Sequence, residues 1–182
     1  MRAGELNKRA TVLALSPDLV PETIGQRWVG IRTKEAADVR AADGLRVSAL
    51  VEVRARFSPC LVPGRYLVHG NRLLHITSAR DFRGDRAELV MSCEELVGEP
   101  GEYRPDGGAP RPARIFLRHI TPFLDDNNNL TDYRLQAEVA LVETGRVQLG
   151  EQLVVAGCVY NVIGYVDGSD DGVVRSIWLE AQ

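Results

Sequence analysis

Residues 47–57, VSALVEVRARF, decide the fold class, because apolar and polar side chains alternate along this stretch. A period of two is typical of a β-strand that buries one face and exposes the other. The side chains predicted to face a core are Val47, Ala49, Val51, Val53, Ala55 and Phe57. Those predicted to face solvent are Ser48, Glu52, Arg54 and Arg56, and Leu50 is an exception to the pattern.

Strand signals recur on both sides of this stretch. Residues 87–94 alternate in the same way, and further strands are predicted at 9–15, 27–33, 66–69 and 72–79. In the rest of the chain they are predicted at 113–118, 134–142, 147–155, 159–166 and 173–180. Gly70-Asn71 and Arg83-Gly84-Asp85 are typical hairpin turns. The sequence therefore predicts an all-β protein.

Residues 34–43, KEAADVRAAD, are the one stretch with a helical composition. They are rich in alanine, Thr33 is a suitable N-cap, and Gly44 stands where a helix commonly ends. The segment is short and weakly amphipathic, so it would depend on tertiary contacts. A short helix and a loop therefore both remain open interpretations.

Residues 98–112, GEPGEYRPDGGAPRP, hold four glycines and four prolines and lack hydrophobic periodicity, which predicts a linker. It separates a domain at 1–97 from a second domain at 113–182, each predicted to be a small antiparallel β-barrel or sandwich. Residues 66–94 and 153–180 share an order of strands and turns that matches Gly70 with Gly157 and Ile76 with Ile163. This favours two similar barrels in tandem, although two unrelated β-meanders would look alike.

Charge is distributed unevenly along the 182 residues, whose net charge is −3. Residues 1–97 carry 15 Lys and Arg against 12 Asp and Glu, whereas residues 98–182 carry 7 against 13. We therefore expect the two halves to contact different surfaces, and we expect no recruitment to nucleic acid through bulk positive charge. With 45% hydrophobic residues but no signal-peptide core or membrane-length apolar run, a soluble protein is predicted.

No pattern of catalytic or metal-binding residues stands out. The residues considered were His69, His75, His119, Cys60, Cys93, Cys158, Asp167, Asp170 and Asp171. The histidines are scattered and the cysteines lack metal-ligand spacing. The VDGSDDG stretch also lacks the full calcium-loop pattern. We predict no enzyme, no metal and no cofactor, a reducing cytoplasm at synthesis, and buried packing roles for Cys93 and Cys158.

Several short motifs follow one another in order along the first 97 residues. They are an AGELNKR opening at residues 3–9, Trp28 near the start of a strand, the Ala-rich segment, the long alternating strand, NRLLHITS at 71–78 and RAELVMSCE at 86–94. In this order and spacing the chain resembles the phage head-tail joining family, the head closure or stopper proteins. Residues 113–182 resemble lambda-type head-tail attachment proteins more weakly. That match rests on Gly157, Tyr160, Val162, Asp167, Gly168, Gly172, Arg175 and Leu179.

The resemblance implies a structural virion protein in the neck of a tailed bacteriophage. Such a protein forms a six- or twelve-fold ring in the head-tail connector. It joins the portal or adaptor protein to tail-terminator and other tail proteins, and it lets double-stranded DNA pass without sequence specificity. Synthesis in the host cytoplasm and no membrane association are also implied.

The resemblance also assigns two sets of contact residues. A channel-facing loop is implied at residues 34–46, with Lys34, Glu35, Asp38, Arg40, Asp43 and Arg46 near the DNA. A short basic arm is implied to dock on the portal side through Arg2, Lys8 and Arg9. The charges in the loop are also consistent with a solvated helix face, and Trp28 is predicted to belong to the core.

Three other functions remain open. One is a nucleic-acid-binding module of the OB type, for which Phe57, Tyr66 and Phe82 are the candidate stacking residues of the first domain. Another is a tail-completion protein of the same virion, and the third is an enzyme of unknown type on a β-barrel scaffold. The acidic second domain argues against the nucleic-acid-binding module because it would repel phosphate.

Overall fold

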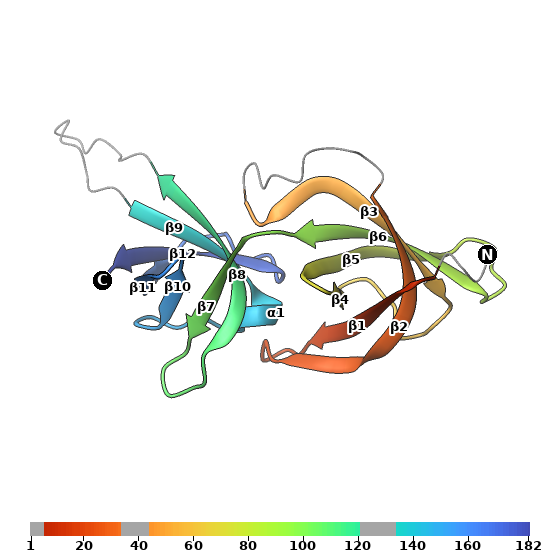
Figure 1. Ribbon diagram of the computed structural model, residues 1–182, viewed down its shortest axis with the longest axis horizontal. Helices are drawn as coiled ribbons and strands as arrows, with labels where there is room; N and C mark the ends of the chain where they lie inside the picture. The colour runs from red at the N-terminus through yellow and green to blue at the C-terminus, as the bar shows by residue number, and fades with distance from the viewer. Residues whose placement is uncertain (1–5, 34–43, 121–133) are drawn as a thin grey trace. The chain divides into compact units, whose positions relative to one another are not determined.

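The computed structural model describes residues 6–33, 44–120 and 134–182, and the predicted helix or loop at 34–43 lies outside them. The chain divides into two compact units, residues 1–97 and 98–182, and each is described by itself. Each unit is a closed antiparallel barrel of six strands, so the predicted all-β fold with two barrels in tandem is confirmed (Figure 1). No helix among the described residues is long and apolar enough to cross a membrane.

The first barrel is built from β1 to β6. The strands are β1 (Lys8–Leu15), β2 (Pro21–Thr33), β3 (Arg46–Arg56), β4 (Tyr66–His69), β5 (Arg72–Asp81) and β6 (Glu88–Leu96). They follow the order β1-β2-β3-β6-β5-β4, and β4 pairs with β1 to close the barrel. Val51, Val53 and Ala55 lie in its core as the alternation predicts, whereas Leu50 and Phe57 are exposed.

The second barrel consists of six strands and a one-turn helix. The elements are β7 (Glu99–Arg104), β8 (Arg111–Ile120), β9 (Arg134–Ala140), α1 (Leu141–Thr144), β10 (Gln152–Val155), β11 (Cys158–Tyr165) and β12 (Val174–Ala181). Their order is β7-β8-β9-β12-β11-β10. The strands β7 to β12 therefore occupy the same positions in the second barrel as β1 to β6 do in the first. The strand predicted at 134–142 ends early because its last two residues enter α1.

The two barrels also share their register. From β4 to the end of β6, each residue corresponds to the residue 86 positions later: Ile76 pairs with Cys93, and Val162 pairs with Leu179. Both β5 and β11 then skip one residue, Thr77 in the first barrel and Ile163 in the second. The predicted matches of Gly70 with Gly157 and of Ile76 with Ile163 are therefore each wrong by one position. The repeat itself is present along the whole ladder.

Buried positions coincide as the common register requires. The equivalent core pairs are Val12 and Tyr103, Val29 and Ile115, Val53 and Ala137, Ala55 and Val139, Leu61 and Val147, Leu67 and Leu153, Ile76 and Val162, Met91 and Ile177, and Cys93 and Leu179. Backbone bonds are repeated as well, because the Gly64 amide donates to Ile76 and the Gly150 amide donates to Val162. Both glycines adopt positive φ, 84° and 86°, which disfavours a side chain there.

The predicted linker at 98–112 is wrong. Its first half is β7, which pairs with both β8 and β10 and closes the second barrel. Tyr103 is the one buried residue of this strand and Glu99 is exposed, so only one large apolar residue marks the buried face. A Cβ atom at Gly101 would lie 2.6 Å from Ile115 Cδ1 and 2.8 Å from the Val154 carbonyl oxygen. The glycine that weakened the strand signal is therefore required by close packing.

Candidate functional site

The predicted channel-facing residues divide between described and undescribed parts of the chain. Lys34, Glu35, Asp38, Arg40 and Asp43 lie outside the described residues. Arg46 is the first residue of β3, and its Nη1 lies 3.3 Å from Glu94 Oε2 on the neighbouring strand β6. Arg46 therefore belongs to the barrel wall.

The predicted docking arm is shorter than residues 1–9. Arg2 lies outside the described residues, whereas Lys8 and Arg9 belong to β1 and pair with Val29 and Trp28 of β2. The backbone carbonyl of Arg9 also hydrogen-bonds the His69 Nδ1 at 2.9 Å. Ladder pairing fixes both basic residues on the barrel, and only their side chains are left to make contacts.

Trp28 is the clearest departure from expectation in the first barrel. It was predicted to lie in the core, yet 59% of it is exposed. Val29 next to it is fully buried, and neighbouring residues of a strand point to opposite faces. The alternation of Val29 and Ile31 thus already contained the signal that Trp28 faces outward.

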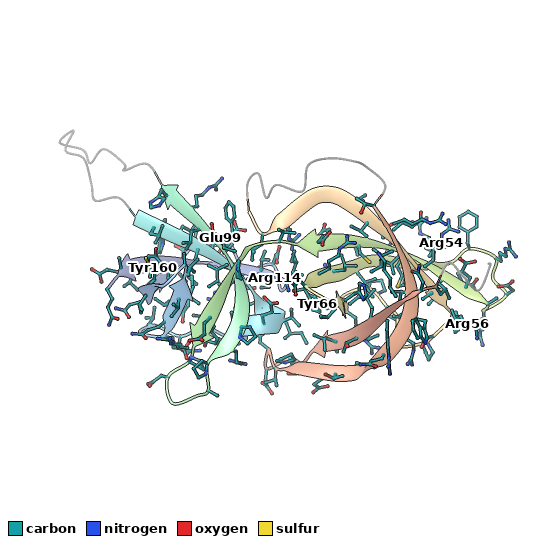
Figure 2. The ribbon with its side chains drawn as sticks, in the orientation of Figure 1. Arg54, Arg56, Tyr66, Glu99, Arg114 and Tyr160 are labelled. Carbon is teal, nitrogen blue, oxygen red and sulfur yellow. The ribbon has the colours of Figure 1, made fainter. Side chains whose placement is uncertain are left out.

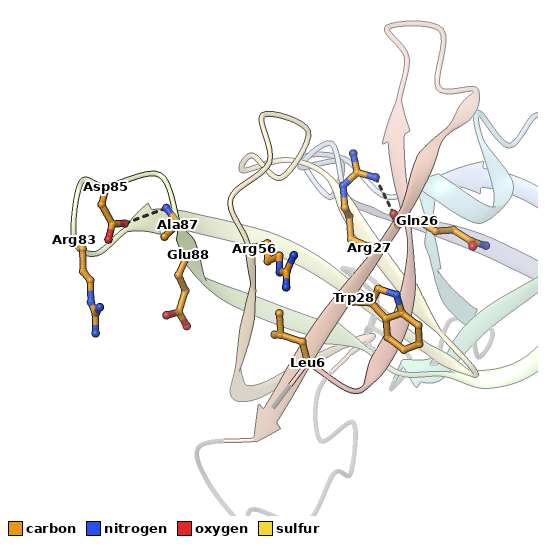
Figure 3. Close-up of a pocket in the computed structure, with 9 residues that line it drawn as sticks. All are labelled: Leu6, Gln26, Arg27, Trp28, Arg56, Arg83, Asp85, Ala87 and Glu88. Carbon is orange, nitrogen blue, oxygen red and sulfur yellow. Dashed lines mark hydrogen bonds between the residues drawn. The ribbon is translucent and has the colours of Figure 1, made fainter. Parts of the chain in front are cut away.

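Trp28 lies in a groove of about 730 Å³ on the first barrel (Figure 3). The groove is formed where β2, the end of β3 and the β5–β6 hairpin meet. Its lining residues are Leu6, Gln26, Arg27, Trp28, Arg56, Arg83, Asp85, Ala87 and Glu88. In Figure 3, Leu6 lies below Arg56 and to the left of Trp28, and Glu88 lies between Arg56 and Arg83 on the side of the hairpin.

The arginines of the groove differ in how they are held. Arg27 donates from Nε to Ser58 Oγ at 3.2 Å and from Nη1 to the Gln26 carbonyl at 2.8 Å. Arg56 and Arg83 are exposed, and neither has an ion-pair or hydrogen-bond partner among the described side chains. These two guanidinium groups remain available to a carboxylate or phosphate.

The acidic residues of the groove are partly occupied. Asp85 Oδ1 accepts a hydrogen bond from the Ala87 amide at 3.0 Å, so this carboxylate stabilises the hairpin turn. Glu88 is half-buried, and its Oε1 lies 3.9 Å from Arg54 Nη1. The remaining positive charge is therefore concentrated at Arg56 and Arg83.

A second, smaller groove of about 510 Å³ adjoins the first and shares Arg83 and Glu88 with it. It is lined by Glu52, Arg54, Ser78, Arg80, Phe82, Arg83, Glu88, Val90 and Ser92. Phe82 is 84% exposed at the hairpin tip, whereas Tyr66, another predicted stacking residue, is buried. Exposed aromatics and arginines thus occupy one region of the barrel surface.

The equivalent region of the second barrel is occupied by the chain itself. Arg114 of β8 corresponds to Trp28, and Figure 2 labels it near the middle of the view. Its backbone amide and its Nε donate to the Glu143 carboxylate of α1, at 2.8 and 2.9 Å. Arg111 Nη2 also donates to the Thr144 carbonyl at 3.1 Å. Helix α1 has no counterpart after β3, so the corresponding surface of the first barrel stays open.

The candidate catalytic and metal-binding residues lie apart from this groove. Within the described ranges no three His, Cys, Asp or Glu side chains are grouped to hold a metal ion. Cys93 is buried as predicted, and burial raises the pKa of its thiol to about 12. Cys158 is exposed, contrary to the prediction, because it is the first residue of β11, directly after the β10–β11 turn.

Comparison with protein-family models, curated proteins and solved structures finds no match to this chain.

Proposed function

We propose that this chain is a structural virion protein of a tailed bacteriophage that works without enzymatic activity in a homo-oligomeric ring of the head-tail connector. The ring joins the portal or adaptor protein to tail proteins. The ordered resemblance of residues 1–97 to head closure proteins supports the class of function. The observation that carries the proposal in three dimensions is the open groove containing Trp28, Arg56 and Arg83. Trp and Arg are enriched where protein interfaces gain their binding energy.

Closed barrels suit subunits of a ring for a physical reason. Every strand edge is paired within its own barrel, so the backbone offers no template for uncontrolled edge-to-edge association. Neighbours must then recognise one another through side chains and loops. The exposed groove residues provide a specific surface of this kind.

The charge distribution fits the passage of double-stranded DNA. Many Lys and Arg contacts to phosphate would hold a translocating duplex, since each neutralised phosphate adds to affinity through counterion release. The net charge is +3 over residues 1–97 and −6 over residues 98–182. A ring of such subunits would attract DNA weakly and would not arrest it.

Electron microscopy of the full chain mixed with its portal and tail proteins tests this proposal. We expect a ring of density at the head-tail junction that is missing when the chain is left out. A chain that stays monomeric and never joins a portal-tail assembly would exclude the connector function.

A second candidate function is single-strand binding, favoured by the exposed Trp28 and Phe82 in grooves that also contain Arg56 and Arg83. Fluorescence anisotropy with a labelled oligothymidine separates the two functions. Micromolar or tighter affinity in moderate salt, lost in Trp28→Ala, would support this candidate. Binding that disappears at moderate salt would reflect only general electrostatics.

A further inference from the structure

One outward-facing row of side chains crosses the wall of the first barrel. Arg9 is opposite Trp28 on β1 and β2, and Arg56 is opposite Glu88 on β3 and β6. Trp28 and Arg56 are neighbours across β2 and β3, one step beyond the pair of Val29 and Ala55. The row thus combines a large exposed ring with positive charge. Such a surface suits a partner segment that carries carboxylates beside small side chains.

The second barrel shows what kind of group can bind at this position of the wall. At the position of Trp28 it has Arg114, which holds the Glu143 carboxylate of α1 through two hydrogen bonds. Side-chain exposures of 17% for Arg114 and 20% for Glu143 place this contact largely out of solvent. The equivalent wall position therefore binds one carboxylate, that of Glu143, in the second barrel and is open in the first.

This chain also presents an acidic segment that could fill the open groove. The β11–β12 hairpin turns through VDGSDDG at residues 166–172, which carries Asp167, Asp170 and Asp171 and no basic residue. All three aspartates are exposed, and Asp171 Oδ1 stabilises the turn by accepting from the Val173 amide at 2.9 Å. Asp167 makes no ion pair or side-chain hydrogen bond with the described residues. Asp170 Oδ1 accepts from the Gly172 amide at 3.0 Å, and its Oδ2 lies 3.8 Å from Arg175 Nη1, so binding would exchange this long, exposed ion pair for the groove arginines.

We propose that the Trp28, Arg56 and Arg83 groove of one copy binds the β11–β12 hairpin of a second copy, with Asp167 and Asp170 facing Arg56 and Arg83. This inference rests on the proposed ring function and names the two surfaces that meet. Because the surfaces differ, the contact is heterologous, and repeating it produces a ring when the rotation closes. It also explains the opposite charges of the two units.

Complementary variants test the contact. Arg56→Glu/Arg83→Glu destroys the groove and keeps the hairpin, and Asp167→Lys/Asp170→Lys does the reverse. In sedimentation velocity at low salt we expect wild type to form higher oligomers and each variant alone to associate about tenfold more weakly. An equimolar mixture of the two variants should associate more strongly than either variant alone, since the intact groove meets the intact hairpin and the Glu-bearing groove meets the Lys-bearing hairpin with the charges exchanged.

Charge-matched controls separate this contact from general electrostatics. Arg32→Glu/Arg146→Glu and Asp106→Lys/Glu180→Lys change the same number of charges on exposed residues outside the two surfaces. We expect both to associate like wild type. Thermal unfolding of every variant, followed by circular dichroism, checks that the barrels remain folded.

Three results would overturn the inference: a mixture that sediments as two monomers, groove or hairpin variants that keep wild-type oligomers, or wild type that stays monomeric at about 100 μM. Fluorescence anisotropy with labelled oligothymidine adds a fourth result. If Arg56→Glu/Arg83→Glu abolishes oligothymidine binding but leaves the oligomers of the chain unchanged, the groove is a nucleic-acid site. If the variants still assemble on the portal as rings, only this contact fails. If wild type does not join a portal-tail assembly either, the connector function fails with it.

Discussion

The two barrels of this chain have the same strand order and register but carry different side chains on their outer surfaces. Strand order, the skipped residue in β5 and β11, and the core positions all correspond. At the equivalent outer positions, however, one barrel exposes Trp28 and the other pairs Arg114 with Glu143. Inward positions must fill a closed core at high density, whereas outward positions are free to change. The comparison therefore separates residues that specify the fold from residues available for binding.

The two barrels differ most in the connection that follows the third strand of each, β3 in the first barrel and β9 in the second. In the second barrel it forms α1 and then Gly145, and the helix holds Arg114 and Arg111. In the first barrel the corresponding connection is two residues shorter, and Ser58 holds Arg27 instead. A difference of two residues in one loop thus accounts for a closed surface on one barrel and a groove on the other.

The largest effect is expected in the cores. Leu67→Ala and Leu153→Ala remove equivalent side chains with no exposed surface, and each should cost its own barrel about 3 kcal/mol. Hydrogen exchange followed by mass spectrometry should show lost protection in the mutated barrel only. The neighbouring half-buried pair, Val68→Ala and Val154→Ala, is the control with smaller effects. Equal loss of protection in both barrels would show that they unfold as one unit.

The next effect contrasts Glu151 with Arg65, its equivalent in the first barrel. Glu151 is buried and accepts from Tyr103 Oη at 2.5 Å, from the Gln148 amide at 2.5 Å and from the Asp106 amide at 3.3 Å. Arg65 donates once, to the Cys60 carbonyl at 2.6 Å.

Glu151→Ala leaves the buried Tyr103 hydroxyl and two part-buried amides without an acceptor and should cost about 3 kcal/mol, against about 1 kcal/mol for Arg65→Ala. Urea unfolding measures both values. Glu151→Gln, which keeps one acceptor oxygen and the shape, should fall between wild type and Glu151→Ala. Equal costs at the two positions would contradict the role given to the carboxylate.

A third prediction concerns the close packing of β7. Gly101→Ala should destabilise the second barrel by about 2 kcal/mol, since the added methyl group meets Ile115 and the Val154 backbone. At the equivalent position the first barrel already holds the buried Ala10. Gly101→Ala/Ile115→Val should recover part of the loss in thermal unfolding, because it removes the atom in closest contact. No recovery would assign the cost to the backbone oxygen instead.

Alkaline pH should distinguish the barrels through Cys93, whose equivalent is Leu179. The pKa of the Cys93 thiol rises from 9.0 to about 12 on folding, so the unfolded state loses its proton first as the pH increases. The first barrel should keep its full stability below pH 9 and lose about 1.4 kcal/mol by pH 10. Urea midpoints at pH 7.5 and 10 measure the loss, and Cys93→Ala should reduce it. An unchanged pH dependence in that variant would assign the loss to other groups.

The smallest effects lie on the outer surfaces. Arg114→Ala should cost the second barrel about 1 kcal/mol, because it leaves the half-buried Glu143 without its guanidinium partner. Trp28→Ala should change stability by no more than about 0.5 kcal/mol, since the ring is largely exposed. Thermal unfolding compares the two variants. A large loss in Trp28→Ala would make this side chain a packing residue after all.

Most of the first barrel could be predicted from the sequence, because alternation is strong in residues 47–57 and 87–94 and turn glycines mark the hairpins. Two elements of the second barrel, β7 and α1, could not be predicted from the sequence. A strand whose one buried residue is Tyr103 and which packs a glycine at position 101 carries little hydrophobic signal, and a single helical turn after β9 carries none. The size and apolar character of Trp28 favour a core position, whereas the alternation of its own strand places it outside, so residue type alone does not predict the groove.

The sequence by itself determined the fold class, the number of barrels and most strand bounds, since these follow from local periodicity and turn chemistry. Only the tertiary structure decided that residues 99–104 close a barrel and that the β5 and β11 irregularities coincide. It also decided that Arg56 and Arg83 meet Trp28 in one groove. Each of these depends on pairing between residues distant in the chain. Such pairing is set by closure of the whole ladder, which no short stretch of sequence contains.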